Sequence, residues 1–176
     1  MKVLGFAGYS GSGKTTLVEQ LIRGLRGQGL RVSVVKHAHH KFEVDQPGKD
    51  SWRHREAGAF EVLVASNQRL VLQRQYEKTT EPKVHELLAQ VYDGVDWVLV
   101  EGFKFSDLPK LEVWRSDAGQ PMLYPEDPYI KAIATDVPGQ LRPTTLRPVL
   151  DLNLPDQVLQ WMLDNGDELV YQTPLV

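Results

Sequence analysis

A glycine-rich octapeptide near the N-terminus carries the clearest chemistry in this chain of 176 residues. Residues 8–15 read Gly-Tyr-Ser-Gly-Ser-Gly-Lys-Thr and match the pattern G-x-x-x-x-G-K-[ST] at every fixed position. In such a loop the glycines allow successive backbone N–H groups to point at one polyphosphate, while the lysine reaches the terminal phosphates and the hydroxyl holds Mg²⁺. A chance match is expected in about one chain of this length in a hundred or fewer. The pattern therefore predicts a phosphate-binding loop that uses Lys14 and Thr15.

The segments on either side of this loop are the ones that such a site requires. Residues 3–7 are apolar and predict a short buried strand, and residues 17–25 place apolar side chains on one face of a helix. Residues 32–35 predict a second strand. This order favours a parallel sheet with a right-handed crossover. The positive end of the helix would face the same anion as the loop.

The remaining elements continue the mixture of helices and strands. They are expected in this order: a short helix capped by Asp50 or Ser51 and ended by Gly58, strands at 62–65 and 70–72, a helix opened by Pro82, strands at 97–100, 111–114, 130–134 and 149–152, and a helix from Pro155. We therefore predict an α/β fold of the P-loop NTPase type, with a mostly parallel sheet flanked by helices, in a single domain over residues 1–176. Residues 60–80 and 105–129 are the candidates for a small β extension used in dimerisation.

Composition narrows the class of protein. Hydrophobic residues make up 41% of the chain, 20 basic against 23 acidic side chains give a net charge of −3, and there is no cysteine. The lack of cysteine excludes a disulfide framework, a cysteine zinc site and a thiol nucleophile, and the acidic balance argues against a broad nucleic-acid surface. No stretch reaches the roughly 18 apolar residues of a membrane span, and no signal-peptide pattern is found. We expect a cytoplasmic protein that binds neither nucleic acid nor membrane.

Two carboxylates are candidates for the second metal ligand that a phosphate-binding loop requires. Glu101 follows the apolar run of residues 97–100, at the strand end where such a ligand usually lies. It would bind Mg²⁺ through a water or orient the attacking water, although a glutamate at a strand end is also compatible with simple solvation. Asp45, in the polar stretch of residues 37–50, is the other candidate.

A histidine-rich basic segment follows the second predicted strand. Residues 36–41 contain His37, His39 and His40 between two lysines. A solvated basic loop, a loop that contacts phosphates and a transition-metal site are all compatible with this composition, because histidine is the commonest metal ligand but no cysteine completes a set.

The sequence gives only a weak indication of which nucleotide base the protein would bind. The Asn-Lys-x-Asp signature of GTPases is absent, but Thr135 and Asp136 directly follow a late strand. A carboxylate there can accept hydrogen bonds from guanine N1–H and its 2-amino group, which adenine lacks. The same residues, followed by Val137-Pro138-Gly139, are also typical of an ordinary turn.

Several segments together resemble one family. They are, in chain order, residues 8–16, 36–40, 45–51, 56–59, 100–104 and 134–136. Their sequence and order resemble the motifs of the molybdopterin-guanine dinucleotide biosynthesis protein B (MobB) adapters, and the resemblance extends over residues 2–164. It implies a Mg²⁺-dependent GTP-binding homodimer with weak GTPase activity. Such a protein assists the nucleotidyltransferase that attaches GMP to molybdopterin, and the resemblance also implies a bridge to the molybdenum-insertion protein.

The resemblance implies roles for individual residues. The residues that would hold phosphates and metal are Ser10, Gly11, Ser12, Gly13, Lys14, Thr15 and Thr16. Asp45 and Glu101 would lie with Thr15 near Mg²⁺ and the hydrolytic water, so that Lys14, Glu101 and Asp45 form the catalytic set, and Thr135 and Asp136 would read guanine. The family's dimer uses strands in the middle of the chain, which suits residues 70–76.

Two other functions stay open from the residues alone. One is a small-molecule kinase that uses the same loop, although the sequence identifies neither its base nor a substrate lid. The other is a metal-carrying accessory protein based on the three histidines of residues 37–40. Nothing in the sequence selects a catalytic arginine among Arg53, Arg55 and Arg69, so we expect hydrolysis to depend on a partner.

Overall fold

The computed structural model describes residues 1–38, 42–78 and 80–173. The chain divides into two compact units, one of residues 1–37 with 84–176 and the other of residues 38–83. Among the described residues, none of the helices has the length and apolar character needed to span a membrane.

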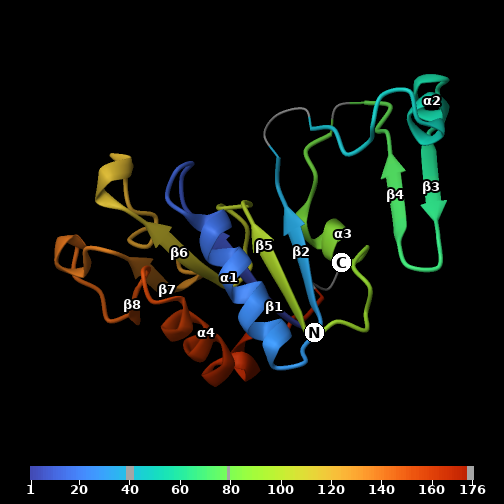
Figure 1. The fold of residues 1–176 in the computed structure, drawn as a ribbon. Helices are drawn as coiled ribbons and strands as arrows, with labels where there is room; N and C mark the ends of the chain where they lie inside the picture. Colours follow the sequence, from blue (N-terminus) through green and yellow to red (C-terminus); the bar gives the residue numbers. More distant parts are fainter. Residues whose placement is uncertain (39–41, 79, 174–176) are drawn as a thin grey trace. The chain divides into compact units, whose positions relative to one another are not determined.

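A six-stranded sheet forms the centre of the larger unit (Figure 1). Its strands are β1 Lys2–Ala7, β2 Val32–Lys36, β5 Trp97–Glu101, β6 Lys110–Trp114, β7 Ile130–Thr135 and β8 Val149–Asp151. They lie in the order β2-β5-β1-β6-β7-β8, and each neighbouring pair is parallel. The predicted α/β class is therefore confirmed. Because the strands all run the same way, the loops that follow them meet at one edge of the sheet.

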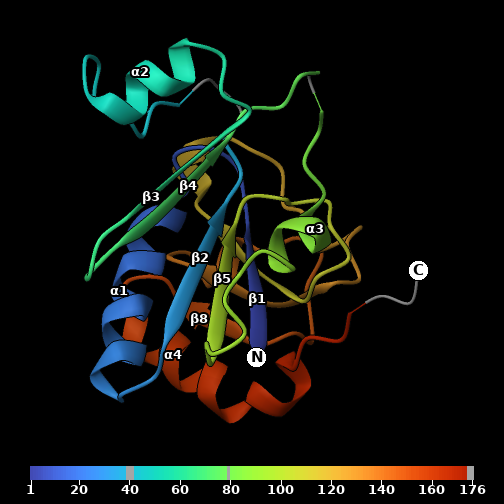
Figure 2. The same cartoon turned by 90° about the vertical axis from the view of Figure 1, so that its right-hand side faces the viewer.

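Helices cover both faces of this sheet, as a parallel sheet requires. The helices of this unit are α1 Lys14–Gly27, α3 Val84–Leu88 and α4 Pro155–Asp164, with short 3₁₀ turns at Ser116–Ala118, Pro138–Gln140 and Gly166–Leu169. Figure 2 shows α1 and α3 on opposite sides of the sheet. Phe6 packs into one hydrophobic cluster with residues of α1 and α4, whereas Val3 packs into another with Leu88 of α3. Alternation along β1 thus divides the core into two layers.

Residues 38–83 form the second unit. It contains α2 Asp50–Glu56 and an antiparallel hairpin of β3 Glu61–Ala65 and β4 Leu70–Arg74, in which Leu63 is paired with Leu72. The hairpin leaves several large apolar side chains in solvent within this unit: Leu63 is 58% exposed and Leu70 is 65% exposed.

One expectation from the sequence is wrong. Neither Asp50 nor Ser51 caps α2, because Lys49 precedes its first residue and the Ser51 hydroxyl instead donates to Asp45 Oδ1 at 2.8 Å. The strand expected at residues 111–114 is found as β6, which lies between β1 and β7 and is buried along its whole length, and a role of residues 105–129 in dimerisation stays a prediction. The charged side chains of Lys110 and Glu112 in this strand are both buried with polar partners.

Candidate nucleotide-binding site

The phosphate-binding loop joins the carboxyl end of β1 to the first residue of α1. Gly8 has φ of +141°, and a Cβ there would lie 2.3 Å from the carbonyl oxygen of Val113, so no other residue fits. Gly13 has φ of +94° and stands before α1 without any side-chain cap on the helix. The free N–H groups of the first turn and the positive end of the helix therefore face the place where the sequence predicts phosphates.

The other residues that the motif predicts to contact phosphates differ in their exposure to solvent. Ser12 is buried, whereas Ser10 and Gly11 are exposed, and Thr16 is exposed in the first turn of α1.

Lys14 is held inside the loop. Its ammonium donates to the carbonyl oxygen of Tyr9 at 2.7 Å and to the hydroxyl of Ser12 at 3.4 Å. Burial lowers the pKa of Lys14 below its ordinary value of 10.5, the carboxylate of Glu101 opposes this shift, and the charges of Lys104 and Lys36 add to it. A polyphosphate in the loop would neutralise this gathering of positive charge.

Glu101 ends β5 beside the loop. In the sheet it is in register with Phe6 of β1 on one side and with Lys36 of β2 on the other. Its Oε1 accepts a hydrogen bond from the Thr15 hydroxyl at 2.6 Å and lies 3.3 Å from the Lys36 ammonium, while the residue as a whole is 8% exposed. Hydroxyl and carboxylate oxygens are the ligands that Mg²⁺ prefers. The structure thus brings two of the three predicted metal ligands together, and their chemistry fits the ion.

Asp45, the third predicted ligand, belongs to the unit of residues 38–83. Its Oδ1 accepts hydrogen bonds from the Gln46 N–H at 3.0 Å and from the Ser51 hydroxyl at 2.8 Å. Its Oδ2 is buried and has no hydrogen-bond partner among the described residues. The role of Asp45 at the metal stays a prediction.

The candidate arginines lie in the same unit. Arg55 forms an ion pair with Glu43 at 2.7 Å, and Arg53 lies 4.0 Å from Asp50. Arg69 is in the turn of the hairpin, where its N–H donates to the Ser66 hydroxyl at 3.1 Å. These contacts select none of the three for catalysis.

The histidine segment is only partly described. The ring of His37 stacks on that of Phe103, with centroids 4.5 Å apart and an angle of 14° between the planes. His39 and His40 lie outside the described residues. Among those that the structure does describe, no group of three histidine, aspartate or glutamate side chains is arranged to hold a metal ion.

Thr135 and Asp136, at the end of β7, differ in how their side chains are engaged. The buried Thr135 accepts the Val137 N–H at 3.3 Å, which is ordinary turn chemistry. Asp136 instead forms an ion pair with Arg115, whose Nη1 lies 2.5 Å from Oδ2. The other carboxylate oxygen, Oδ1, is buried and has no hydrogen-bond partner in the described part of the chain. It is an acceptor to which a ligand could donate.

Arg115 connects this carboxylate to the phosphate-binding loop. It directly follows β6, where Trp114 is paired with Thr135 of β7. Its Nε lies 3.5 Å from the position that a Cβ of Gly13 would take. No pattern in the sequence marks Arg115, and only the pairing of β6 with β7 brings it to Asp136.

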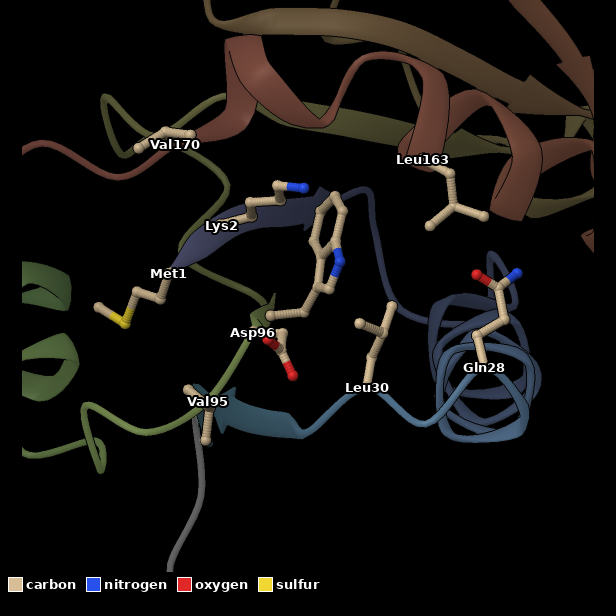
Figure 3. Close-up of a pocket in the computed structure, with 9 residues that line it drawn as sticks. Met1, Lys2, Gln28, Leu30, Val95, Asp96, Leu163 and Val170 are labelled. Carbon is tan, nitrogen blue, oxygen red and sulfur yellow. The ribbon is translucent and has the colours of Figure 1, made fainter.

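A separate hollow of about 480 Å³ lies at the opposite edge of the sheet. Met1, Lys2 and Trp97, at the amino ends of β1 and β5, line it together with Leu30 and Leu163 (Figure 3). The Lys2 ammonium lies 5.5 Å from the centroid of the buried Trp97 ring. Because the phosphate-binding loop is at the carboxyl end of β1, this hollow is not part of the candidate site.

Most of the sequence matches one family of known proteins. A model of the family described as molybdopterin guanine dinucleotide synthesis protein B, MobB, matches residues 3–136. The chain belongs to the MobB family. Two relatives are named molybdopterin-guanine dinucleotide biosynthesis adapter protein. The one from Haemophilus influenzae is 42% identical over 163 residues, covering 91% of this chain and 86% of the relative. The one from Escherichia coli is 39% identical over 166 residues, covering 91% and 93%.

Solved MobB structures share this fold. The crystal structure of a MobB homologue from Bacillus stearothermophilus has a TM-score of 0.71 at 26% identity and covers 96% of this chain and 99% of that one. Bacillus subtilis MobB has a TM-score of 0.72 at 22% identity and covers 94% and 98%. The MobB match over residues 3–136 includes all the residues that the sequence analysis assigned to the site.

Proposed function

We propose that this chain is a GTP-binding adapter in molybdopterin-guanine dinucleotide biosynthesis, with weak Mg²⁺-dependent GTPase activity. The observation that carries the proposal is the contact of Thr15 with Glu101, 2.6 Å apart, beside an uncapped helix N-terminus. It joins a hydroxyl and a carboxylate suited to Mg²⁺ with a loop suited to polyphosphate. When held by Thr15 and Glu101, Mg²⁺ would supply positive charge that neutralises the phosphates.

Residues of this chain would divide the work of binding. Lys14 would turn from the Tyr9 carbonyl to the terminal phosphates, and Ser10, Gly11, Ser12 and Gly13 would surround them. Thr15, Glu101 and Asp45 would hold the metal, with Thr16 in the first turn of α1.

Guanine is favoured over adenine by Asp136. Its unpartnered Oδ1 can accept a hydrogen bond from N1–H or from the 2-amino group, and adenine has no such donor pair. Thr135, which is buried and engaged in the turn, would support the backbone there.

Slow hydrolysis is consistent with how Glu101 is engaged. Its carboxylate accepts from Thr15 and pairs with Lys36, so it is suited to holding the metal and its water rather than to removing a proton. Full catalysis would then need groups from a partner.

The names of the relatives, which call them adapter proteins, support a role through partners. We propose the nucleotidyltransferase that attaches GMP to molybdopterin as the main partner, with the molybdenum-insertion protein as a further one. We also propose a cytoplasmic homodimer formed through the hairpin of β3 and β4, whose apolar side chains include Leu63 and Leu70. Exposed apolar patches of this kind mark association surfaces.

Calorimetric titration with GTP and ATP in the presence of Mg²⁺ tests the proposal. We expect tighter binding of GTP than of ATP, and loss of about a hundredfold in affinity for Lys14→Ala, because a charged hydrogen-bond partner of the phosphates is removed. Lys131→Ala, at an exposed position of β7, is the matched control and should bind as the wild type does. Lack of GTP binding would contradict the proposal, and phosphoryl transfer to a small acceptor would favour a kinase instead.

A further inference from the structure

A completely buried lysine anchors the loop that follows β5. Lys110, in β6, is 0% exposed. Its ammonium donates to the carbonyl oxygens of Lys104 at 3.1 Å and Ser106 at 2.5 Å, and it forms an ion pair with Asp127 at 2.7 Å. These three acceptors satisfy the three N–H bonds of the ammonium. Since a buried charge is costly unless it is fully paired, this arrangement holds the loop of residues 102–109 firmly against β6.

The first residues of the same loop are held in unusual conformations. Gly102 has φ of +96°, and a Cβ there would lie 2.8 Å from the Cβ of His37. Phe103 has φ of +49°, in the left-handed region that non-glycine residues rarely adopt, and its ring stacks on His37. A backbone in this region persists only where surrounding contacts impose it, and such strain gathers at functional sites.

This construction places the side chain of Lys104 on the phosphate-binding loop. Its ammonium lies 3.9 Å from the centroid of the Tyr9 ring and 5.1 Å from that of Phe105. The carbonyl oxygen of the same Tyr9 accepts the ammonium of Lys14. The two lysines are thus brought to one residue of the loop, Lys104 over its ring and Lys14 on its backbone.

The charge balance around Lys104 is unfavourable without an anion. No carboxylate lies within ion-pair distance of Lys104 in the part of the chain that the structure describes. The tethered loop brings the ammonium of Lys104 to the ring of Tyr9, whose carbonyl oxygen already accepts the ammonium of Lys14. An anion bound between the two lysines would balance their positive charges.

We propose that Lys104 is a second phosphate-binding lysine, which leaves the Tyr9 ring to contact the terminal phosphate of a bound nucleoside triphosphate. This inference rests on the proposed nucleotide binding and deepens it. Tyr9 holds the ammonium near the loop before the nucleotide arrives, so that little side-chain entropy is lost on binding. The extra contact distinguishes a triphosphate from a diphosphate.

The test compares affinities for GMPPNP, GDP and GMP with Mg²⁺ in the full-length protein. Lys104→Met keeps the length of the side chain without its charge, and we expect it to weaken GMPPNP binding about tenfold or more but GDP binding less than about threefold. Lys104→Arg keeps the charge and should retain most of the discrimination between the two. Lys131→Met, at the exposed position of the otherwise buried β7, is the matched control and should change no affinity by more than about twofold.

The outcomes separate this inference from the proposed function. If the wild type fails to bind GMPPNP, the proposed function itself is contradicted. If the wild type binds GMPPNP but Lys104→Met leaves its affinity unchanged, or weakens GMPPNP and GDP equally, only the role of Lys104 is overturned. Thermal unfolding of each variant verifies that the fold is intact.

Discussion

The hydroxyl of Thr15 donates a 2.6 Å hydrogen bond to Glu101, although the two residues are 86 positions apart in the sequence. Their meeting follows from the parallel pairing of β1 with β5, in which Phe6 is in register with Glu101. The same two oxygens are the ones that would hold Mg²⁺ in the proposed site.

Replacing Glu101 by glutamine tests this arrangement. We expect Mg²⁺ to tighten GTP binding in the wild type, and Glu101→Gln to lose about tenfold of that tightening, because a carboxylate near the ion is replaced by a neutral amide. Titrations with Mg²⁺ and with EDTA measure the effect. Glu19→Gln, whose carboxylate forms an exposed ion pair with Arg23 on α1, is the control. An equal loss with and without Mg²⁺ would contradict the role of Glu101 at the metal.

The unpartnered oxygen of Asp136 leads to a prediction about base selection. Asp136→Asn should weaken GTP binding about tenfold to a hundredfold, because the amide opposes the guanine 2-amino donor with a donor of its own. Xanthosine triphosphate, which has an oxygen at that position, should bind the variant more tightly than it binds the wild type. Asp117→Asn, at an exposed position after β6, is the control. If Asp117→Asn alone changed the base preference, the base would be assigned to the loop after β6 and not to Asp136.

Charged substitutions in the exposed hairpin of β3 and β4 should disrupt the proposed dimer. The double variant Leu63→Lys, Leu70→Lys should convert a dimer to a monomer, since it places lysines where apolar side chains 58% and 65% exposed would pack in an interface. Sedimentation equilibrium measures the change, and GTP affinity should be retained. Tyr92→Lys, at a position 69% exposed in the larger unit, should leave the mass unchanged. A double variant that stays dimeric would exclude the hairpin as the interface.

The lowered pKa of Asp107 predicts that the stability of the folded protein depends on pH. His85 lies between Asp107 and Tyr171: its Nε2 is 2.7 Å from Asp107 Oδ1, and its Nδ1 is 2.7 Å from the Tyr171 hydroxyl. The hydrogen bond between His85 and Asp107 is the main cause that lowers the pKa of Asp107 below 3.8. The unfolded chain therefore binds the proton more readily. The stabilisation is fully present above 3.8 and is lost as the pH falls through the lower pKa of the folded state.

Urea unfolding at several pH values checks this sign. Asp107→Asn should be less stable than the wild type at neutral pH by at most about 1 kcal/mol, since the carboxylate is largely in solvent. The difference should shrink in acid. Asp93→Asn, at another exposed position, should be neutral. A difference between Asp107→Asn and the wild type that grows in acid would contradict the assignment.

Alanine substitutions at Gly8 and Gly27 compare a position where the backbone requires glycine with one where it does not. Gly8→Ala should destabilise the protein by about 2 kcal/mol or more, because its Cβ would lie 2.3 Å from the Val113 carbonyl oxygen and its φ is +141°. Gly27→Ala, in the last turn of α1 with open space around it, should stabilise by about 0.5–1 kcal/mol. Thermal unfolding measures both, and equal effects would refute the steric argument.

Local patterns in the sequence predicted much of this fold. The phosphate-binding loop, its flanking strand and helix, and the carboxylate at the end of β5 are local features, because the spacing of glycines, lysine and apolar residues acts over a few positions. The order of the sheet and the burial of β6 were less accessible, since Lys110 and Glu112 have the composition of a solvent-facing strand.

By itself the sequence determined the α/β class and the glycine-rich loop between its first strand and helix, and it predicted Lys14, Thr15 and Glu101 as site residues. Only the tertiary structure decided that Arg115 pairs with Asp136 and that Lys104 lies over Tyr9. The physical reason is that these partners come from different strands and loops, brought to one edge by the order β5-β1-β6-β7. No spacing along the chain encodes that order, which results from burying both faces of the sheet.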